Sequence, residues 1–579
     1  MNYTLIQSTE KAQSVVEQVL LNRGLTADKI ARYINPTADE EFSPRFLDNI
    51  VQAAKKLLIT IFNQEDIYVQ IDSDCDGYTS SALLLNYLHR LFPAYVENHI
   101  SYGVHNKKHH GINIDDVPKG IKLVVIPDAS SNEVELHKQL WDEGIQTIIL
   151  DHHHAPIDES DPAIIVNNQM CGYPNKALSG VGIVYKFCLV IDEILGESYA
   201  DNYLDLVALG MIADMMDLRE LETRYLIVEG LKDIRNPFFL EMVNKNEFKI
   251  KGEFNPFTIS WYVAPFINAM TRSGTLDEKK LLFKSMLEYE AYKLVPSTKR
   301  GCSGTEELLV EQAVRVCGNV KNRQEKEKQK TLDVIYQAIE EQNADSRNVL
   351  IVQIEESLDN NLNGLMANHI MAEFGKPTLI LTKRDKENII TWEGSARGYM
   401  TDKVSDWRQF CEDSQYTLYA EGHPFAFGVG FTPEGLEHFK QLIETLFPES
   451  FEKNYKVDFA WDDKETLDSD ILEIAQYRYL WGQEVSEPLV VINTVLEEQN
   501  IALMGKGTLK ISIPGTKTTC IKFGYGEEKY FNLMSAFKNS TGIRVEIVGY
   551  CRENIWNGNV SPQIEIQDFQ VNKILKWNF

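Results

Sequence analysis

Three aspartates at alternate positions follow one short apolar run of the chain. Asp72, Asp74 and Asp76 come directly after IYVQI (Ile67–Ile71). Like charges packed this closely repel each other and contribute nothing to a fold. We therefore expect a positive charge among them, and a bound divalent cation would supply it.

Further acidic and imidazole side chains stand at comparable places along the chain. They are Asp128, the run Asp151-His152-His153, and Asp214. Carboxylates together with an imidazole suit Mn²⁺ or Mg²⁺, and the set lacks the thiolates of a structural zinc site. So many ligands predict two ions about 3.5–4 Å apart, which activate water and stabilise a phosphorus centre during in-line displacement. Asp128 is the candidate for a bridge between the ions.

These candidate ligands fall where predicted strands end. Short β-branched runs at Ile67–Ile71, Lys122–Ile126, Thr147–Leu150 and Ala163–Val166 alternate with helical patterns, which predicts a parallel α/β sheet. Open sheets of this kind bind ligands at the carboxyl ends of their strands. A single aspartate there can be a turn residue or a helix N-cap, but three successive strand ends are poorly explained in that way. Asp214 is expected to interrupt an apolar helix, LDLVALGMIADMMDL, and to point into the site.

The length of 579 residues exceeds what one hydrophobic core organises, so several domains are expected. We expect a helical segment over 1–60, the parallel-sheet domain over 61–300, and a long charged helix over 301–345 that bridges two bodies. A smaller α/β domain over 346–455 and a strand-rich C-terminal barrel of about five short strands over 456–579 follow.

The composition describes a folded protein, with 44% hydrophobic and 25% charged residues. The net charge of −27 argues against indiscriminate coating of nucleic acid. Residues 491–579 hold ten Lys and Arg against eight Asp and Glu, a balance of 10 − 8 = +2. If any segment binds a polyanion through its overall charge, we expect it to be this one. Eight cysteines without a CxxC spacing indicate reduced thiols in a cytoplasmic protein. No apolar run is long enough to cross a membrane, and the first residues do not resemble a secretory signal.

Four sequence motifs carry a family resemblance. DSDCDG, PDAS, DHHH and LVALGMIAD resemble, in order, the four motifs of the DHH phosphoesterase superfamily, and LSGVGIVY resembles the segment after the DHH motif in its RecJ branch. APFINAMTRSGTLDE is similar to a further RecJ segment. NGLMANHIMAEFGKPTLILT, GSARG and GHPFAFGVGF look like the associated DHHA1 domain, and WGQEVSEPLVV with NIWNGNVSPQIEIQDF is similar to the oligonucleotide-binding (OB) barrel of RecJ.

The resemblance implies a DHH domain, a DHHA1 domain and an OB-fold, and a 5′→3′ exonuclease that degrades single-stranded DNA to mononucleotides in repair and recombination. It implies two Mn²⁺ or Mg²⁺ ions. Asp74 and Asp128 would hold one ion, with Asp72 nearby. The second ion would be held by Asp76, Asp128, His152 and Asp214. His153 would meet the scissile phosphate, and Asp151 would orient the histidines, so that Asp128, Asp151 and His153 carry the chemistry. A monomer is expected, with a single-strand-binding protein or a helicase as partner by resemblance alone.

Candidate contacts to nucleic acid lie in four segments outside the acidic cluster. The segments are a basic loop, an asparagine and arginine pair, the glycine-rich DHHA1 motifs, and the barrel, and their residues are Lys107, Lys108, His110, Asn268, Arg272, Ser395, Arg397, His423, Lys522 and Tyr525. Guanidinium groups suit phosphate, and rings interleaved with cations suit stacked bases. A solvated loop, a surface arginine or core aromatic rings would explain the same residues without a ligand.

Two other functions use the same sequence features. The metal-ligand set would also serve a phosphodiesterase for short oligoribonucleotides or cyclic dinucleotides, although such a small substrate gains little from a remote barrel. A catalytically silent scaffold of a replication or repair complex is the third interpretation, and the presence of every candidate ligand disfavours it.

Overall fold

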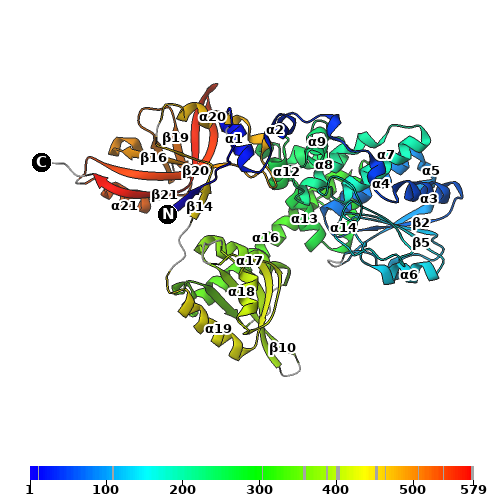
Figure 1. Ribbon diagram of the computed structural model, residues 1–579. Helices are drawn as coiled ribbons and strands as arrows, with labels where there is room; N and C mark the ends of the chain where they lie inside the picture. The colour runs from blue at the N-terminus through cyan, green and yellow to red at the C-terminus, as the bar shows by residue number, and fades with distance from the viewer. Residues whose placement is uncertain are drawn as a thin grey trace.

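The protein is described by a computed structural model of residues 1–575, apart from residues 11, 107–109, 303, 356–359, 387–388, 400–403, 450–453, 463, 506 and 539. Figure 1 shows three bodies: a sheet covered by helices, a smaller α/β body around α17–α19, and a β-rich body at the C-terminal end. The expected α/β fold class with a β-rich C-terminal domain is confirmed. The division of the chain near residues 60, 300, 345 and 455 stays a prediction.

The first body is built on a five-stranded sheet in which every neighbouring pair of strands is parallel, as expected. Its order is β3-β2-β4-β5-β6. The strands are β2 (Ile67–Ile71), β3 (Ile100–Val104), β4 (Leu123–Pro127), β5 (Gln146–Asp151) and β6 (Ile164–Asn167). All residues of β2 and β4 are buried, because helices cover both faces of such a sheet.

Helices make up the rest of the first body. They are α3 (Ile50–Phe62), α4 (Cys75–Leu91), α5 (Pro93–His99), α6 (Val134–Asp142), α7 (Gly180–Leu195), α8 (Leu204–Ala213), α9 (Leu221–Gly230), α10 (Pro237–Lys245), α11 (Glu247–Ile250), α12 (Pro256–Tyr262), α13 (Ala264–Ser273), α14 (Leu276–Met286) and α15 (Glu288–Ala291). Helix α4 is buried from Cys75 to Leu88 and packs against both α7 and α8, so it is the central helix of this core.

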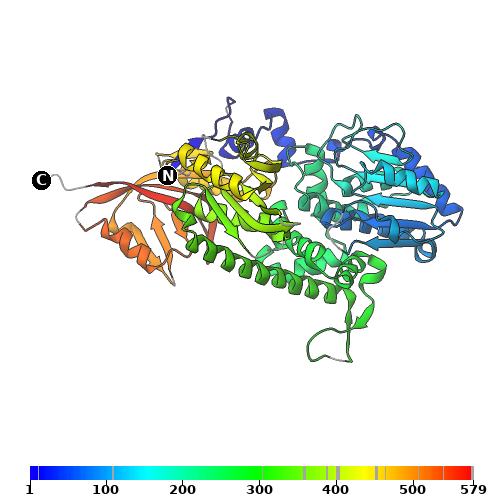
Figure 2. The same cartoon turned by 90° about the horizontal axis from the view of Figure 1, so that it is seen from below.

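One long helix, α16 (Leu309–Glu341), connects the first body to the second. A small hairpin, β7 (Leu294–Pro296) and β8 (Glu306–Leu308), precedes it. Val310, Ala313, Val314, Cys317 and Val320 on its buried face belong to the core of the first body, whereas Leu332, Ile335 and Ile339 belong to a core of the second. Figure 2 shows this helix in green, near the lower edge of the molecule in that view. Helix α16 therefore bridges two bodies, as its charged sequence predicts.

The second body is a mixed sheet with the order β12-β13-β11-β10-β9. Its strands are β9 (Leu350–Ile354), β10 (Thr378–Lys386), β11 (Ile389–Arg397), β12 (Thr417–His423) and β13 (Ala426–Phe431). Three helices accompany it, α17 (Asn360–Phe374), α18 (Trp407–Asp413) and α19 (Pro433–Leu446). Only the β9–β10 pair is parallel among these pairs.

The C-terminal body is a seven-stranded sheet with the order β15-β16-β20-β21-β19-β18-β17. The strands are β15 (Phe459–Trp461), β16 (Leu489–Leu496), β17 (Ile501–Met504), β18 (Thr508–Ser512), β19 (Thr519–Lys522), β20 (Gly542–Trp556) and β21 (Asn559–Leu575), with helices α20 (Leu467–Gln476) and α21 (Glu527–Ser535). The sequence predicted about five strands. The structure has more because a turn at Glu498–Asn500 divides one predicted run into β16 and β17, and because β15 adds an edge strand.

The N-terminal segment differs from the helical expectation for residues 1–60. Helices α1 (Val15–Asn22) and α2 (Ala27–Ile34) are present, but the chain begins with a strand, β1 (Asn2–Leu5), parallel to β14 (Asn454–Val457). A strand whose partner lies so far along the chain leaves no local signal in the sequence. Helix α3 starts at Ile50, and Pro44–Phe46 before it forms a separate 3-10 turn. Other 3-10 turns are Ala38–Glu40, Ile114–Asp116, Ala200–Tyr203, Ala344–Ser346 and Arg478–Leu480.

None of the helices within the described residues is long and apolar enough to span a bilayer. The eight cysteine thiols are all free.

Candidate metal centre

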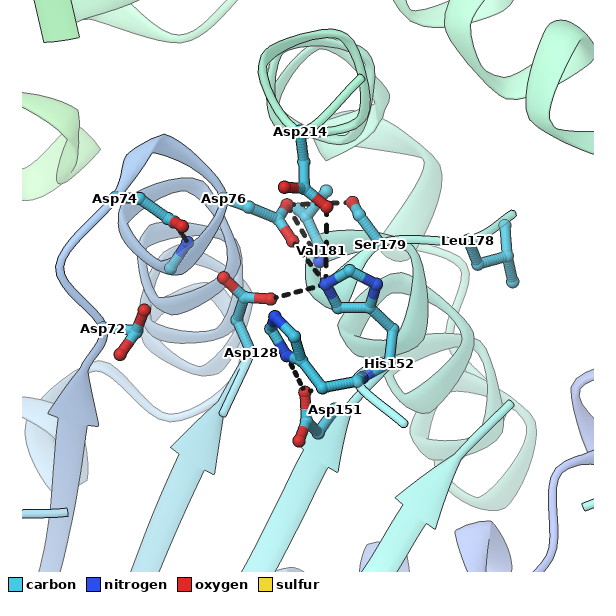
Figure 3. A network of polar contacts seen from close by, with 12 residues as sticks. Asp72, Asp74, Asp76, Asp128, Asp151, His152, Leu178, Ser179, Val181 and Asp214 are labelled. Carbon is cyan, nitrogen blue, oxygen red and sulfur yellow. Dashed lines mark hydrogen bonds and ion pairs between the residues drawn. The ribbon is translucent and has the colours of Figure 1, made fainter. Parts of the chain in front are cut away.

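The acidic cluster forms at the carboxyl edge of the first sheet, where the sequence predicts it. Asp72 follows β2, Asp128 follows β4 and Asp151 ends β5, and these three strands are neighbours in the sheet. Because the strands run in one direction, their ends meet at one edge. Figure 3 shows the carboxylates of this edge facing one space together with His152 and Asp214.

Asp128 stands at the centre of this edge. Its backbone adopts a left-handed conformation with φ of 69°, which the donation of its amide to the carbonyl of Leu150 (2.8 Å) helps to hold. The side chain is buried, and burial together with the charge of Asp76 raises the pKa of Asp128 well above its ordinary value. Burial and the charge of Asp76 disfavour the ionised form of this carboxyl group, and a bound cation would stabilise that form.

Asp74 and Asp76 lie at the start of α4. Asp74 caps the helix by accepting a hydrogen bond from the amide of Gly77 (3.0 Å). Asp76 is buried in the first turn, where its Oδ1 accepts hydrogen bonds from Ser179 Oγ (2.9 Å) and the amide of Val181 (3.3 Å). Burial raises the pKa of Asp76 to about 6.

Asp214 lies just beyond the last turn of α8, whereas the sequence predicts that it interrupts the helix. The helix ends at Ala213, and Asp214 caps it with its side chain 30% exposed. Burial, followed by repulsion from Asp76 and Asp74, raises the pKa of Asp214 to about 8. The side chain still points into the site, because the helix end itself faces the sheet edge (Figure 3).

His152 brings these carboxylates together. Its Nε2 lies 3.2 Å from Asp128 Oδ1, 3.4 Å from Asp214 Oδ2 and 4.0 Å from Asp76 Oδ2. Burial lowers the pKa of His152 to about 4, so the imidazole is neutral at pH 7, the form that ligates metals.

Three buried polar atoms of this group lack a hydrogen-bond partner within the described part of the chain. They are Asp76 Oδ2, Asp128 Oδ1 and His152 Nε2. Buried polar atoms are almost always satisfied, so three at one point require an explanation. The donor set of carboxylates and a neutral imidazole fits Mn²⁺ or Mg²⁺, and ligand atoms of Asp76, His152 and Asp214 lie within 4.8 Å of one another.

Asp151 holds the two histidines in place. Its Oδ1 accepts hydrogen bonds from the amide of His152 (2.7 Å) and from Nδ1 of His153 (2.8 Å), and its Oδ2 accepts one from the amide of Ser131 (3.0 Å). Burial would raise the pKa of Asp151, but the bond and charge of His153 outweigh it and lower that pKa to about 2. The same bond raises the pKa of His153 to about 9, which leaves a cationic imidazole on the open side of the site.

Asp72 forms a second small group. Its Oδ2 lies 2.7 Å from His110 Nδ1, and its Oδ1 accepts a hydrogen bond from the amide of Gly111 (3.1 Å). Ligand atoms of Asp72, Asp74 and His110 lie within 4.8 Å of one another. His110, which the sequence assigned to a DNA-guiding loop, therefore contacts the first aspartate of the cluster. Lys107 and Lys108 of the same loop lie outside the described residues.

Three glycines press against the aspartates, and the sequence interpretation gave them no role. An added Cβ would lie 2.6 Å from Asp72 Cβ at Gly77, 2.4 Å from Asp128 Oδ1 at Gly180, and 2.5 Å from Asp76 Oδ1 at Gly210. Each distance is shorter than real Cβ contacts allow. The glycines therefore set how closely α4, α7 and α8 approach the acids. Their places inside the DSDCDG, LSGVG and LVALG motifs were the available signal.

The remaining candidate residues for nucleic acid lie on other elements. Asn268 and Arg272 are on α13, with Arg272 exposed in its last turn. Ser395 and Arg397 are half-buried on β11, where burial lowers the pKa of Arg397, and His423 is exposed at the end of β12.

The two candidates of the C-terminal body are partly engaged within it. Lys522 Nζ donates to the carbonyl of Gln567 (2.7 Å), and the Tyr525 ring centre lies 5.8 Å from that of Phe569. The sheet of this body places both residues near one strand, β19, and the loop after it. Their roles stay predictions.

Known proteins match this chain over its whole length. The DHH family N-terminal domain model matches residues 66–211, and the RecJ OB domain model matches residues 462–568. The YorK protein of the SPbeta prophage in Bacillus subtilis, named a single-strand DNA-specific exonuclease, is 35% identical over 99% of this chain and 98% of its own length. The single-stranded-DNA-specific exonuclease RecJ of Bacillus subtilis is 27% identical over 96% of this chain and 68% of its own length.

A solved structure agrees with the fold. RecJ from Thermus thermophilus in complex with Mn²⁺ has a TM-score of 0.69 at 18% identity, over 100% of this chain and 81% of that one. At that identity the likeness establishes the fold alone, while the sequence match to YorK extends through both family domains. From its motifs, its sheet topology and these matches, the chain belongs to the RecJ branch of the DHH phosphoesterase family.

Proposed function

We propose that the protein is a metal-dependent exonuclease that hydrolyses single-stranded DNA from the 5′ end and releases mononucleotides. The observation that carries the proposal is the convergence of Asp76 Oδ2, Asp128 Oδ1 and His152 Nε2, three buried atoms without hydrogen-bond partners among the described residues, beside Asp214. The names of the relatives, single-stranded-DNA-specific exonucleases, support the substrate class.

The residues present can hold two divalent ions. Asp76, Asp128, His152 and Asp214 would hold one, and Asp74 with Asp128 would hold the other, with Asp72 nearby. Mn²⁺ or Mg²⁺ bound there would supply activation of a water nucleophile and neutralisation of charge on the reacting phosphate. Asp128 lies at the centre of the sheet edge, and we assign it to both positions.

The protein's own groups complete the chemistry. His153 is protonated at neutral pH because Asp151 raises its pKa to about 9, so it can donate a hydrogen bond to a non-bridging phosphate oxygen. Asp151 is the positioning residue, since its Oδ1 accepts hydrogen bonds from the imidazole of His153 and from the backbone amide of His152.

Single strands would reach the site from the C-terminal body. Lys522 and Tyr525 lie on and after β19 of the OB domain, a combination suited to a backbone and its stacked bases. Arg272, Arg397 and His423 would contact phosphates, and Arg397 and His423 belong to the second body. A place in DNA repair or recombination, next to a single-strand-binding protein or helicase, extends the same proposal.

The test follows strands labelled at the 5′ or the 3′ end, with and without Mn²⁺, in wild type and Asp128→Ala. We expect metal-dependent loss of the 5′ label first, and no degradation by the variant although it still binds the strand. Asp142→Ala, an exposed aspartate at the end of α6, is the matched control and should behave as wild type. Loss of the 3′ label first would reject the polarity, and faster hydrolysis of a dinucleotide than of a long strand would reject the substrate.

A further inference from the structure

The first strand and first helix of the chain are fastened to the C-terminal body. Besides the β1–β14 pairing, Arg23 forms a two-pronged ion pair with Asp458, with Nη1–Oδ1 at 2.7 Å and Nη2–Oδ2 at 2.8 Å. Asn22 Nδ2 donates to the same carboxylate (3.1 Å), and Arg23 Nε donates to the carbonyl of Ser486 (3.0 Å). The Arg23 and Asp458 side chains are only 8% and 1% exposed. A buried, bidentate pair of this kind fixes the position of α1 relative to the C-terminal body. Loss of either partner would leave an unpaired charge in the protein interior, which is strongly destabilising.

The next helix of the same segment is fastened to the first body. Helix α2 packs against α9, and the buried Tyr33 of α2 lies under the guanidinium of Arg224 from α9, 4.8 Å from its ring centre. Arg224 also donates to the carbonyls of Tyr33 and Tyr479 (3.4 Å each), and the Tyr33 hydroxyl donates to the carbonyl of Leu480 (2.6 Å). Tyr479 and Leu480 belong to the turn between α20 and β16. Residues 1–34 therefore touch both bodies and the chain that runs between them.

An apolar recess lies at the same junction. It has a volume of about 300 Å³, and its walls come from both bodies. Met215, Phe257 and Trp261 line it from the first body, and Trp481 and Tyr550 line it from the C-terminal side. Met215 directly follows Asp214, so the recess lies between the metal centre and the OB domain. Its shape depends on how firmly the two bodies are held together.

We propose that residues 1–34 act as a clasp that locks the OB domain against the first body and thereby positions a long strand for the metal centre. Arg23 and Tyr33 are the positioning residues of the clasp, and the inference rests on the proposed function. A strand held at two sites on one rigid frame binds more tightly than at either site alone, and this gain of about 10²–10⁴ is lost when the sites cannot be engaged together. The clasp then acts on binding of long strands, while the chemical step depends on the acidic cluster alone.

The test compares Arg23→Met with wild type in the full-length protein. We expect KM for a long single strand to rise at least about tenfold with kcat unchanged, while kcat/KM for a trinucleotide stays within about twofold of wild type. Small-angle X-ray scattering of the same samples should show a larger radius of gyration. Arg45→Met is the matched control, because Arg45 lies just after the clasp and makes a comparable two-pronged pair, with Glu193, on the first body alone. It should leave KM and scattering unchanged.

Tyr33→Phe is the second variant, and it removes only the hydroxyl that bonds to Leu480. It should raise KM for the long strand in the same direction by a smaller factor, with its fold intact. Unchanged KM and unchanged scattering in both variants would overturn the clasp. Scattering also decides the question if wild type hydrolyses no DNA, in which case the proposed function falls and the mechanical role of residues 1–34 is judged by itself.

Discussion

Gly210→Ala tests whether the spacing of the helices sets the metal centre. Gly210 lies in α8, and a Cβ there would be 2.4 Å from Thr79 Oγ1, 2.5 Å from Asp76 Oδ1 and 2.7 Å from Val181 Cγ1. Ordinary contacts begin at 3.4 Å, so the Asp76 oxygen would have to retreat by 3.4 − 2.5 = 0.9 Å. Asp76 has little room, because Ser179 and the amide of Val181 already bind the same oxygen.

Gly210→Ala is expected to have a small effect on stability and a large effect on the rate of hydrolysis. Alanine favours a helix over glycine by about 1 kcal/mol, and overpacking a core costs about 1–3 kcal/mol, so the net loss of stability should be about 0–2 kcal/mol. A displacement near 1 Å in a reacting constellation costs on the order of 10² in rate. We therefore expect a roughly hundredfold fall in Mn²⁺-dependent hydrolysis from a protein that remains folded.

The assay combines initial rates at increasing Mn²⁺, calorimetric titration with Mn²⁺, and urea unfolding. Gly182→Ala on the neighbouring helix α7 is the control, because its Cβ would meet Leu178 at 3.3 Å and needs only a slight adjustment. The reasoning would be refuted by a Gly210→Ala protein with nearly wild-type rate and metal affinity, or by an equal loss in Gly182→Ala.

Three further predictions concern charge in the first body. In metal-free protein, the raised pKa of His153 contributes stability that is complete below about pH 6.5 and disappears as pH rises through about 9, so the difference in Tm between wild type and His153→Gln should shrink over that range. Asp214, whose pKa is raised to about 8, makes the metal-free protein less stable as pH rises from about 4 to 8, so the rise in Tm on adding Mn²⁺ should be larger at pH 8 than at pH 6. Lys186→Met removes a fully buried ammonium that lies 2.8 Å from the buried Glu222 carboxylate, and should cost about 3–5 kcal/mol in urea unfolding, whereas Lys138→Met on the surface should cost less than about 1 kcal/mol. A flat pH profile in the first two, or equal unfolding midpoints in the third, would contradict these assignments.

The sequence was sufficient for four strands of the first sheet and for the gathering of its acids, but it did not predict the edge strand β3 or the strand order. The runs before Asp72, Asp128 and Asp151 are short, β-branched and separated by helices, so the parallel arrangement and the shared edge follow from general rules of parallel sheets. The position of Asp214 relative to the sheet edge was harder to predict from the sequence. Asp214 looked like a charge within a helix because MMDL continues the apolar pattern, but Met215 adopts a left-handed φ of 58°, and the helix has already ended at Ala213.

Other features depend on contacts between distant segments, which a single sequence does not display. The bond from His110 to Asp72 spans 38 positions, and the pairing of Asn2 with Asn454 joins two widely separated parts of the chain. Gly77, Gly180 and Gly210 received no role from the sequence, because only the packed structure shows which atoms an added methyl group would contact. Periodicity identifies elements, whereas such contacts require the assembled core.

The pairing of β1 with β14 has a consequence for biosynthesis. The amino-terminal strand leaves the ribosome about 450 residues before its partner, which at about 5–20 residues per second is a delay of roughly 20–90 s. During that interval the nascent first body can fold while β1 has no partner strand. If residues 1–34 act as proposed, the protein would gain its tighter binding of long DNA only after β14 has been synthesised, and a chain that stops before β14 would never gain it.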